Sequence, residues 1–156
     1  MTTKEAQVWD KLFKQLDNGE AVRSIAFTPD EKLIVSQLPL ISAKPLIYAC
    51  NIDMDSMMDG TNELATKFTK YVNEKYPTIP VVTLSALLEN EIVKIRTEDG
   101  GNEDQAGEFM QLYGLEESRL DILLEHCSNV LGLQKFYTAG PSQVSSWFIE
   151  KGSTAP

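Results

Sequence analysis

The hydrophobic residues near the start of the chain recur at the spacing of an α-helix. Residues three or four positions apart lie on one face of a helix, and this spacing links Val8, Trp9, Leu12, Phe13 and Leu16. The pair Asn18-Gly19 follows them and is typical of a helix end. We therefore expect a helix over the first part of the chain.

A second helix is predicted by the polar residues at its start. Thr28 suits the N-cap, Pro29 suits the first helical position, and Glu31 can complete a capping box with Thr28. Pro39 ends the hydrophobic run that follows. Residues 1–42 are thus expected to form a small helical segment without strands.

The middle of the chain alternates between strand-like and helix-like patterns. Apolar runs at 45–52 and 80–85 are typical of strands that are buried on both faces of a parallel sheet. Between them, residues 55–60 indicate a loop and residues 62–75 a helix. This helix is expected to bury Leu64, Ala65, Phe68, Tyr71 and Val72. Strand, helix and strand in this order predict a right-handed βαβ unit.

The last part of the chain changes its pattern twice. Residues 98–105 are polar and indicate a solvated loop, and helices near 105–113 and 117–131 are expected to follow. The second of these helices carries an apolar stripe made of Leu120, Leu123, Leu124, Cys127, Val130 and Leu131. Short strand-like runs at 136–139 and 144–149 then flank a Gly-Pro turn, which predicts a hairpin.

Length and composition place the chain among globular proteins. Its 156 residues are enough for one compact domain, and 42% hydrophobic with 24% charged residues is an ordinary mixture. No apolar stretch approaches the ~20 residues that span a bilayer, and the first residues lack a signal-peptide pattern. Cys50 and Cys127 lie far apart without metal-type spacing. We expect a cytoplasmic chain with no membrane partner and two buried, reduced thiols.

The net charge of −9 is concentrated in one region of the sequence. Between Glu98 and Glu125 the chain has nine acidic residues and one basic residue, Arg119. Such a region repels the phosphate backbone of DNA and RNA. No direct nucleic acid binding is therefore expected from this chain.

Two short polar signatures follow the two predicted parallel strands, at the edge of the sheet where ligands bind in such folds. An Asn-x-x-acid turn followed by a Ser-Ala turn is the arrangement with which P-loop NTPases hold a purine base. The alternative is that a strand end carries Asn and Asp to satisfy a turn. The candidate base-binding residues are Asn51, Ile52, Asp53, Met54, Ser85, Ala86 and Leu87.

The phosphate-binding half of such an enzyme has no counterpart in the sequence. A P-loop requires Gly-Lys followed by Ser or Thr, because these groups hold phosphate and Mg²⁺, and the chain contains no Gly-Lys dipeptide. The stretch 104–107 has the Asp-x-x-Gly form of a γ-phosphate switch but follows a polar loop instead of a strand. His126 and Cys127 are neighbours in a helix, where their side chains diverge by about 100°. No catalytic or metal-binding residue is therefore assigned.

Longer stretches of the sequence resemble one protein family. The strand that ends at Asn51, the Leu84-Ser85-Ala86 turn, the helix opening 113–118 and the ending 134–156 carry the resemblance. They are similar to the Obg-like ATPases of the YchF subfamily, and the resemblance covers nearly the whole chain.

This resemblance implies an α/β fold, namely an incomplete P-loop NTPase that is Rossmann-like with a parallel sheet. Family members have a P-loop nucleotide domain that is interrupted by a helical insertion and followed by a TGS domain of β-grasp type. On this basis, residues 1–42 match the returning part of the insertion and residues 43–132 the last third of the nucleotide domain. Residues 133–156 match the first hairpin of a TGS domain.

The resemblance also implies a function for the complete protein, which would hydrolyse ATP or GTP with Mg²⁺ at its P-loop. Family members favour ATP and are linked to ribosomes or translation factors. Their base-recognition turn reads Asn-x-x-Glu, so Asn51 and Ile52 match it, whereas Met54 replaces the acid. Because methionine cannot accept the hydrogen bonds that guanine donates, guanine selectivity is not expected. The chain by itself should bind ATP or GTP weakly and should not hydrolyse either.

Two further expectations concern protein partners. The chain could instead be a non-catalytic interaction module that docks a partner through its helices and hairpin. In addition, a sheet without its remaining strands has an open edge, which predicts self-association, local disorder or low stability.

Overall fold

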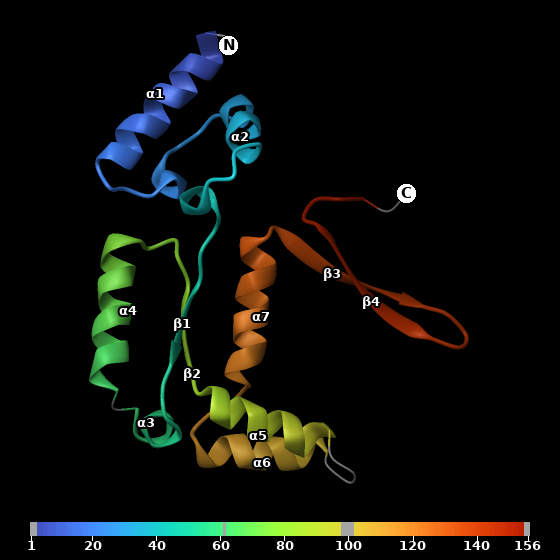
Figure 1. Ribbon diagram of the computed structural model, residues 1–156. Helices are drawn as coiled ribbons and strands as arrows, with labels where there is room; N and C mark the ends of the chain where they lie inside the picture. Colours follow the sequence, from blue (N-terminus) through green and yellow to red (C-terminus); the bar gives the residue numbers. More distant parts are fainter. Residues whose placement is uncertain (1–2, 61, 98–101, 155–156) are drawn as a thin grey trace. The chain divides into compact units, whose positions relative to one another are not determined.

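The computed structural model describes residues 3–60, 62–97 and 102–154 and contains two compact units (Figure 1). The first unit comprises Met1–Pro45 and the second Leu46–Pro156. The division into three segments at residues 42 and 132 stays a prediction.

The first unit is helical, as expected. It contains α1 (Thr3–Asp17), α2 (Pro29–Ser36) and two short 3₁₀ turns, η1 (Val22–Ser24) and η2 (Ile41–Ala43). The capping box is confirmed, because the Thr28 hydroxyl accepts from the Glu31 N–H while the Glu31 carboxylate accepts from the Thr28 N–H. Four buried residues form the core of this unit: Val8, Leu12, Val22 and Val35.

The second unit contains the strand–helix–strand arrangement that the sequence predicts. Strand β1 (Tyr48–Asn51) pairs in parallel with β2 (Val81–Leu84), and α4 (Glu63–Lys75) connects them. The register aligns Tyr48 with Val81 and Asn51 with Leu84. The two strands therefore end side by side.

Two of the helices in this unit differ from expectation. Residues 55–60 were expected to form a loop, but α3 (Met54–Asp59) occupies most of this stretch. The Asp53 carboxylate caps the start of α3, and Gly60, with a φ of +64°, ends it. Helix α5 (Ala86–Thr97) has no counterpart among the expected elements.

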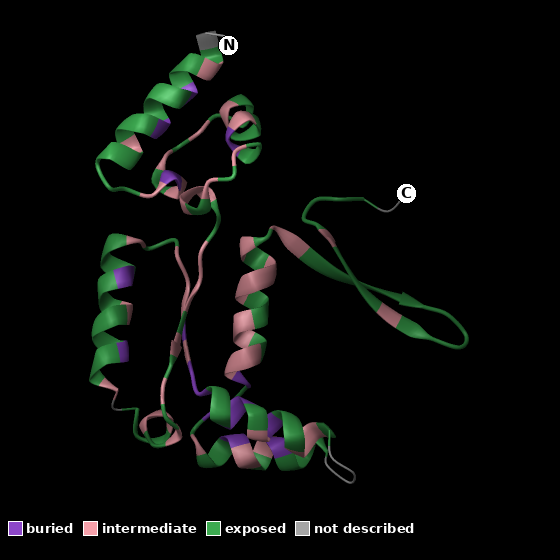
Figure 2. Cartoon of the chain, viewed as in Figure 1, coloured by how far each residue is buried: buried purple, intermediate pink, exposed green. Residues whose placement is uncertain are grey.

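Helices α5, α6 (Glu103–Leu112) and α7 (Arg119–Val130) follow one another along the chain. The expectation of a loop at 98–105 is wrong for residues 103–105, which form the start of α6, while 98–101 lie outside the described residues. Buried residues gather where α5 meets α6 (Figure 2). The buried core there consists of Leu88, Ile92, Ala106, Met110 and Leu115.

Burial around the parallel strands is lower than the apolar pattern predicts. On α4, Ala65 and Val72 are buried, but Leu64, Phe68 and Tyr71 are 79%, 37% and 52% exposed. The residues of β1 are half-buried or exposed, and α7 has no buried residue despite its apolar stripe. The two cysteines are likewise only half-buried. The physical reason is that, in the part of the chain that the structure describes, this sheet has two strands, so β1 has one strand neighbour.

The predicted hairpin is confirmed and is longer than expected. Strands β3 (Leu133–Ala139) and β4 (Val144–Glu150) are antiparallel neighbours, with Phe136 opposite Trp147. The Trp147 indole N–H donates to the Thr138 hydroxyl at 3.0 Å. The chain is thus a mixed α/β protein with one small parallel and one small antiparallel sheet among its described residues.

Candidate functional site

The two polar signatures lie at the same end of the parallel strands. Asn51 and Leu84 are register partners, and the Ile52 N–H donates to the Leu84 carbonyl at 2.9 Å. This hydrogen bond extends the ladder by one residue beyond β1. The turns that begin at Ile52 and Ser85 are therefore adjacent, as parallel pairing requires.

Asn51 connects the two turns directly. Its side-chain Oδ1 accepts a hydrogen bond from the Ala86 N–H at 2.9 Å. Ala86 is the first residue of α5, and the first N–H groups of a helix have no acceptor within the helix. Asn51 thus caps α5 from the neighbouring strand, and the exposed Asn51 side chain retains its NH₂ group as a donor.

The backbone donors of this site are partly engaged within the protein. The N–H groups of Ile52 and Ala86 already have acceptors, Leu84 and Asn51 respectively. Helix geometry leaves the next donors of α5, at Leu87 and Leu88, without an intrahelical acceptor. A planar ligand beside the turns would therefore meet the Asn51 amide and the start of α5.

Asp53 and Met54 serve the local structure. The Asp53 carboxylate accepts from the Ser56 N–H at 2.7 Å and from the Ser56 hydroxyl at 2.8 Å. These hydrogen bonds lower the pKa of Asp53 below its ordinary value. Met54 is half-buried and packs against the core between α5 and α6.

The residues of the second turn differ strongly in their exposure. Ser85 is buried, with 2% of its surface exposed, whereas Leu87 is 60% exposed and Ala86 is also exposed. Of the seven candidate residues, Asn51, Ala86 and Leu87 thus combine exposure with a position at the junction of the two turns.

A cleft of about 810 Å³ lies beside this junction within the second unit. Among the seven candidates, Ile52 alone lines it. Its walls come from α3, α4, β2 and the start of α7, and they include Met57, Ala65, Thr69, Lys70, Val82 and Arg119. The two turns and this cleft are therefore neighbouring features that share one residue.

One buried polar contact near the junction was not predicted from the sequence. The Glu89 carboxylate, 5% exposed, accepts from the Ser118 hydroxyl at 2.6 Å and from the Arg119 N–H at 2.9 Å. Its signals in the sequence are an acid in the first turn of α5 and a Ser at the N-cap of α7. These signals indicate a contact only after both α5 and α7 have been assigned as helices.

The described residues contain no group of three or more His, Cys, Asp or Glu side chains that could hold a metal ion. Among the described helices, none is both long enough and apolar enough to span a membrane.

Proteins of similar sequence occur in bacteria and yeast. No protein-family model matches the chain. The ribosome-binding ATPase YchF of Bacillus subtilis is 31% identical over 153 residues, which cover 97% of this chain and 40% of that protein. Its counterpart in Escherichia coli O157:H7 is 30% identical over 97% of the chain and 39% of its own length. Obg-like ATPase 1 of Saccharomyces cerevisiae is 26% identical over 98% of the chain and 37% of its own length.

A solved structure agrees with these similarities in sequence. The Schizosaccharomyces pombe YchF GTPase superposes with a TM-score of 0.83 and 25% identity, covering 97% of this chain and 39% of that one. The chain therefore spans about two fifths of the length of the relatives that it matches.

Proposed function

Because this chain belongs to the YchF/Obg-like ATPase family as a partial homologue, we propose that it supplies the base-recognition side of a YchF-type nucleotide site. The observation that carries the proposal is the 2.9 Å hydrogen bond from the Ala86 N–H to Asn51 Oδ1. It joins the two turns that would meet a purine base.

The Asn51 amide has the chemistry that this role requires. Its Oδ1 is used within the protein to fix the start of α5, so its NH₂ group is oriented by that contact. A purine N7 is an acceptor and pairs with such a donor. The Ile52 carbonyl would accept from the adenine N6 amino group. One side chain thus braces the neighbouring turn and contacts the ligand.

We further propose that the site does not select guanine. Guanine recognition needs an acceptor for its N1–H and N2 amino groups. At the fourth position of the turn, Met54 instead packs against the core, and the neighbouring Asp53 carboxylate accepts hydrogen bonds from Ser56. Adenine lacks these donors and needs no acceptor at this position.

Hydrolysis is proposed for the complete site and not for this chain by itself. Phosphoryl transfer depends on positioning and on neutralising phosphate charge with a P-loop and Mg²⁺, and the sequence has no Gly-Lys dipeptide. The relatives in B. subtilis and E. coli are named ribosome-binding ATPases. Ribosome association and a cytoplasmic location are proposed for this protein on the same basis.

Two substitutions at one position separate recognition of the base from support of the turn. Asn51→Asp keeps an acceptor for the Ala86 N–H but lacks the NH₂ donor, whereas Asn51→Ala lacks both. ATP added at millimolar concentration to the wild-type chain should shift the amide NMR signals of Asn51, Ile52, Ser85 and Ala86. Asn51→Asp should abolish these shifts with unchanged thermal stability, and Asn51→Ala should also lower stability by about 1 kcal/mol.

Calorimetry completes this test. ATP binding should be weaker than millimolar, and phosphate release should be undetectable. Micromolar binding of ATP, or an Asn51→Asp variant that responds to ATP like the wild type, would contradict the proposal.

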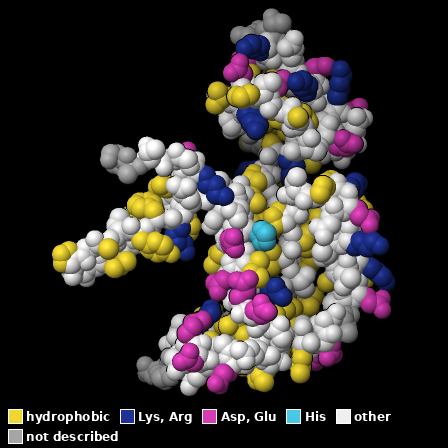
Figure 3. Space-filling model, turned by 180° about the vertical axis from the view of Figure 1, so that it is seen from behind, with side chains coloured by type: hydrophobic (Ala, Val, Ile, Leu, Met, Phe, Trp, Pro, Cys, Tyr) yellow, Lys and Arg dark blue, Asp and Glu magenta, His cyan; other side chains and the backbone are white. Residues whose placement is uncertain are grey.

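A second candidate function is favoured by the surface of the hairpin. Several of its large side chains are between 53% and 69% exposed, namely Tyr137, Val144, Trp147 and Phe148. Figure 3 shows hydrophobic groups along the hairpin. Such a surface suits a module that docks another polypeptide segment. If ATP leaves the turn signals unchanged while a protein partner shifts the hairpin signals, the interaction module replaces the base site as the function.

A further inference from the structure

A buried carboxylate lies one helical turn beyond the Ser85-Ala86 turn and has no part in the base contacts proposed above. Both oxygens of Glu89 are bound by the start of α7, Oε2 by the Ser118 hydroxyl and Oε1 by the Arg119 N–H. A buried charge requires such donors, and the positive end of the α7 dipole stabilises it further.

The backbone of Glu89 belongs to the same turn of helix as Ala86. The Glu89 N–H donates to the Ser85 carbonyl at 2.9 Å, which closes the first turn of α5. Ala86 is held on its other side by Asn51. The start of α5 is thus fixed from two directions, by β1 through Asn51 and by α7 through Glu89.

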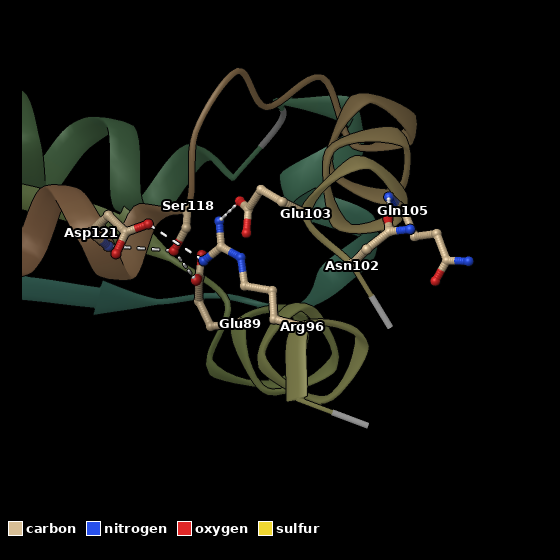
Figure 4. Close-up of polar contacts among 7 residues, drawn as sticks. All are labelled: Glu89, Arg96, Asn102, Glu103, Gln105, Ser118 and Asp121. Carbon is tan, nitrogen blue, oxygen red and sulfur yellow. Dashed lines mark hydrogen bonds and ion pairs between the residues drawn. The ribbon is translucent and has the colours of Figure 1, made fainter. Parts of the chain in front are cut away.

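A second contact ties the same face of α5 to α7 (Figure 4). Arg96 follows Glu89 by seven residues, or about two helical turns, and donates to the Asp121 carboxylate at 3.5 Å. The Asp121 N–H in turn donates to the Ser118 hydroxyl at 3.3 Å. These contacts connect Glu89, Ser118, Asp121 and Arg96 in one chain of hydrogen bonds, so α5 cannot shift along α7 without breaking several of them.

We propose that Glu89 is a positioning residue that holds the Ser85-Ala86 turn in the orientation in which it meets a base. Its carboxylate does not contact the ligand. It fixes α5 against α7, so that the Ala86 N–H stays within hydrogen-bonding distance of Asn51. The consequence for nucleotide rests on the proposed function, but the effect on Ala86 is measurable without nucleotide.

The test compares Glu89→Gln with the charge-matched control Glu108→Gln, whose side chain is exposed on α6. Glutamine keeps the shape of Glu89 but can accept only one of the two hydrogen bonds from Ser118 and Arg119. Amide hydrogen exchange of the whole chain should accelerate about tenfold at Ala86 and Arg119 in Glu89→Gln. Exchange at both amides should be unchanged in Glu108→Gln.

The exchange rates at Ala86 and Arg119 distinguish the possible roles of Glu89. Faster exchange at Arg119 with unchanged exchange at Ala86 would show that Glu89 only caps α7, and it would overturn the inference. Equal acceleration across the second unit would show general destabilisation and would also overturn it. If Glu89→Gln does not fold, Ser118→Ala removes one donor and keeps the carboxylate, and unchanged exchange at Ala86 in that variant overturns the inference.

Adding ATP distinguishes a failure of this inference from a failure of the proposed function. If ATP shifts the wild-type signals of Asn51 and Ala86, Glu89→Gln should reduce those shifts and Glu108→Gln should not. If ATP leaves the wild-type signals unchanged, the proposed function fails, and the exchange rates still decide whether Glu89 positions the turn.

Discussion

At the scale of the residue, side chains that the sequence suggests as ligand contacts also stabilise the local structure. Asn51 caps α5, Asp53 caps α3 and Met54 packs against the core between α5 and α6. Asn51 differs from the other two because its amide has both an acceptor and a donor. It can hold Ala86 and still offer its NH₂ group to a ligand.

The cap at Asp53 gives a prediction about pH. Hydrogen bonds from Ser56 lower the pKa of Asp53 in the folded state. The stabilisation of α3 by this carboxylate is therefore fully present above the unfolded-state pKa of about 3.9 and is lost as the pH falls through the folded-state pKa. The amide NMR signal of Ser56 should titrate with a midpoint below the ordinary Asp value.

Two variants check this assignment. Asp53→Asn should remove the titration from the Ser56 signal, whereas Asp55→Asn, in the exposed first turn of α3, should leave it in place. A midpoint at or above the ordinary Asp value would contradict the account of the cap.

At the scale of the element, α5 is the helix on which the candidate site depends. Its first N–H is capped by Asn51, its Glu89 and Arg96 side chains bind α7, and its apolar face packs on α6. The helix therefore fixes the Ser85-Ala86 turn through its packing and through its polar contacts.

Two neighbouring leucines of α5 test the packing. Leu88 is fully buried in the core with α6, and Leu87 is 60% exposed. Leu88→Ala should lower the free energy of unfolding by about 2–5 kcal/mol because it leaves a cavity. Leu87→Ala should change it by less than about 0.5 kcal/mol. Urea unfolding of both variants measures the difference, and equal losses would contradict this placement of α5.

The sequence predicted the elements that have strong local signals. Thr28, Pro29 and Glu31 mark the start of α2 without reference to the rest of the chain, and the βαβ pattern fixed which strand ends would meet. Helix α5 was missed because its hydrophobic residues are divided between a buried face and exposed positions such as Leu87. The short helix α3 depends on the Asp53 cap, which also resembles a turn.

Among the site residues, too, only contacts with strong local signals could be predicted. Parallel pairing could be inferred from the apolar runs, and it brought Asn51 and Ala86 together. Glu89 could not be inferred, because its partners Ser118 and Arg119 lie about thirty residues later in the chain and meet it only through tertiary packing. Exposure of Leu64 and Tyr71 likewise depends on which neighbouring elements cover α4.

At the scale of the whole molecule, the parallel sheet has two strands within the described residues, so each strand has an unpaired edge. Such edges pair readily with other chains. The average mass measured by sedimentation equilibrium should therefore rise with protein concentration. A strictly monomeric chain with a high melting temperature would contradict this expectation.

A matched pair of lysine substitutions locates the contact. Ala49 is exposed on β1, and lysine on an edge strand opposes edge-to-edge pairing. Ala49→Lys should reduce self-association. Thr97→Lys makes the same change of charge at an exposed position on α5 and should leave it unchanged. Equal effects of the two variants would indicate a general effect of charge instead of pairing through β1.

In the proposed function, this chain contributes contacts to the base and none to the phosphates. The most direct measurement follows the amide NMR signals of Asn51 and Ala86 while adenosine, ATP or inorganic triphosphate is added to separate samples. Adenosine should shift these signals as strongly as ATP does, and inorganic triphosphate should leave them unchanged. Shifts with triphosphate, or no response to adenosine at concentrations where ATP acts, would contradict the account.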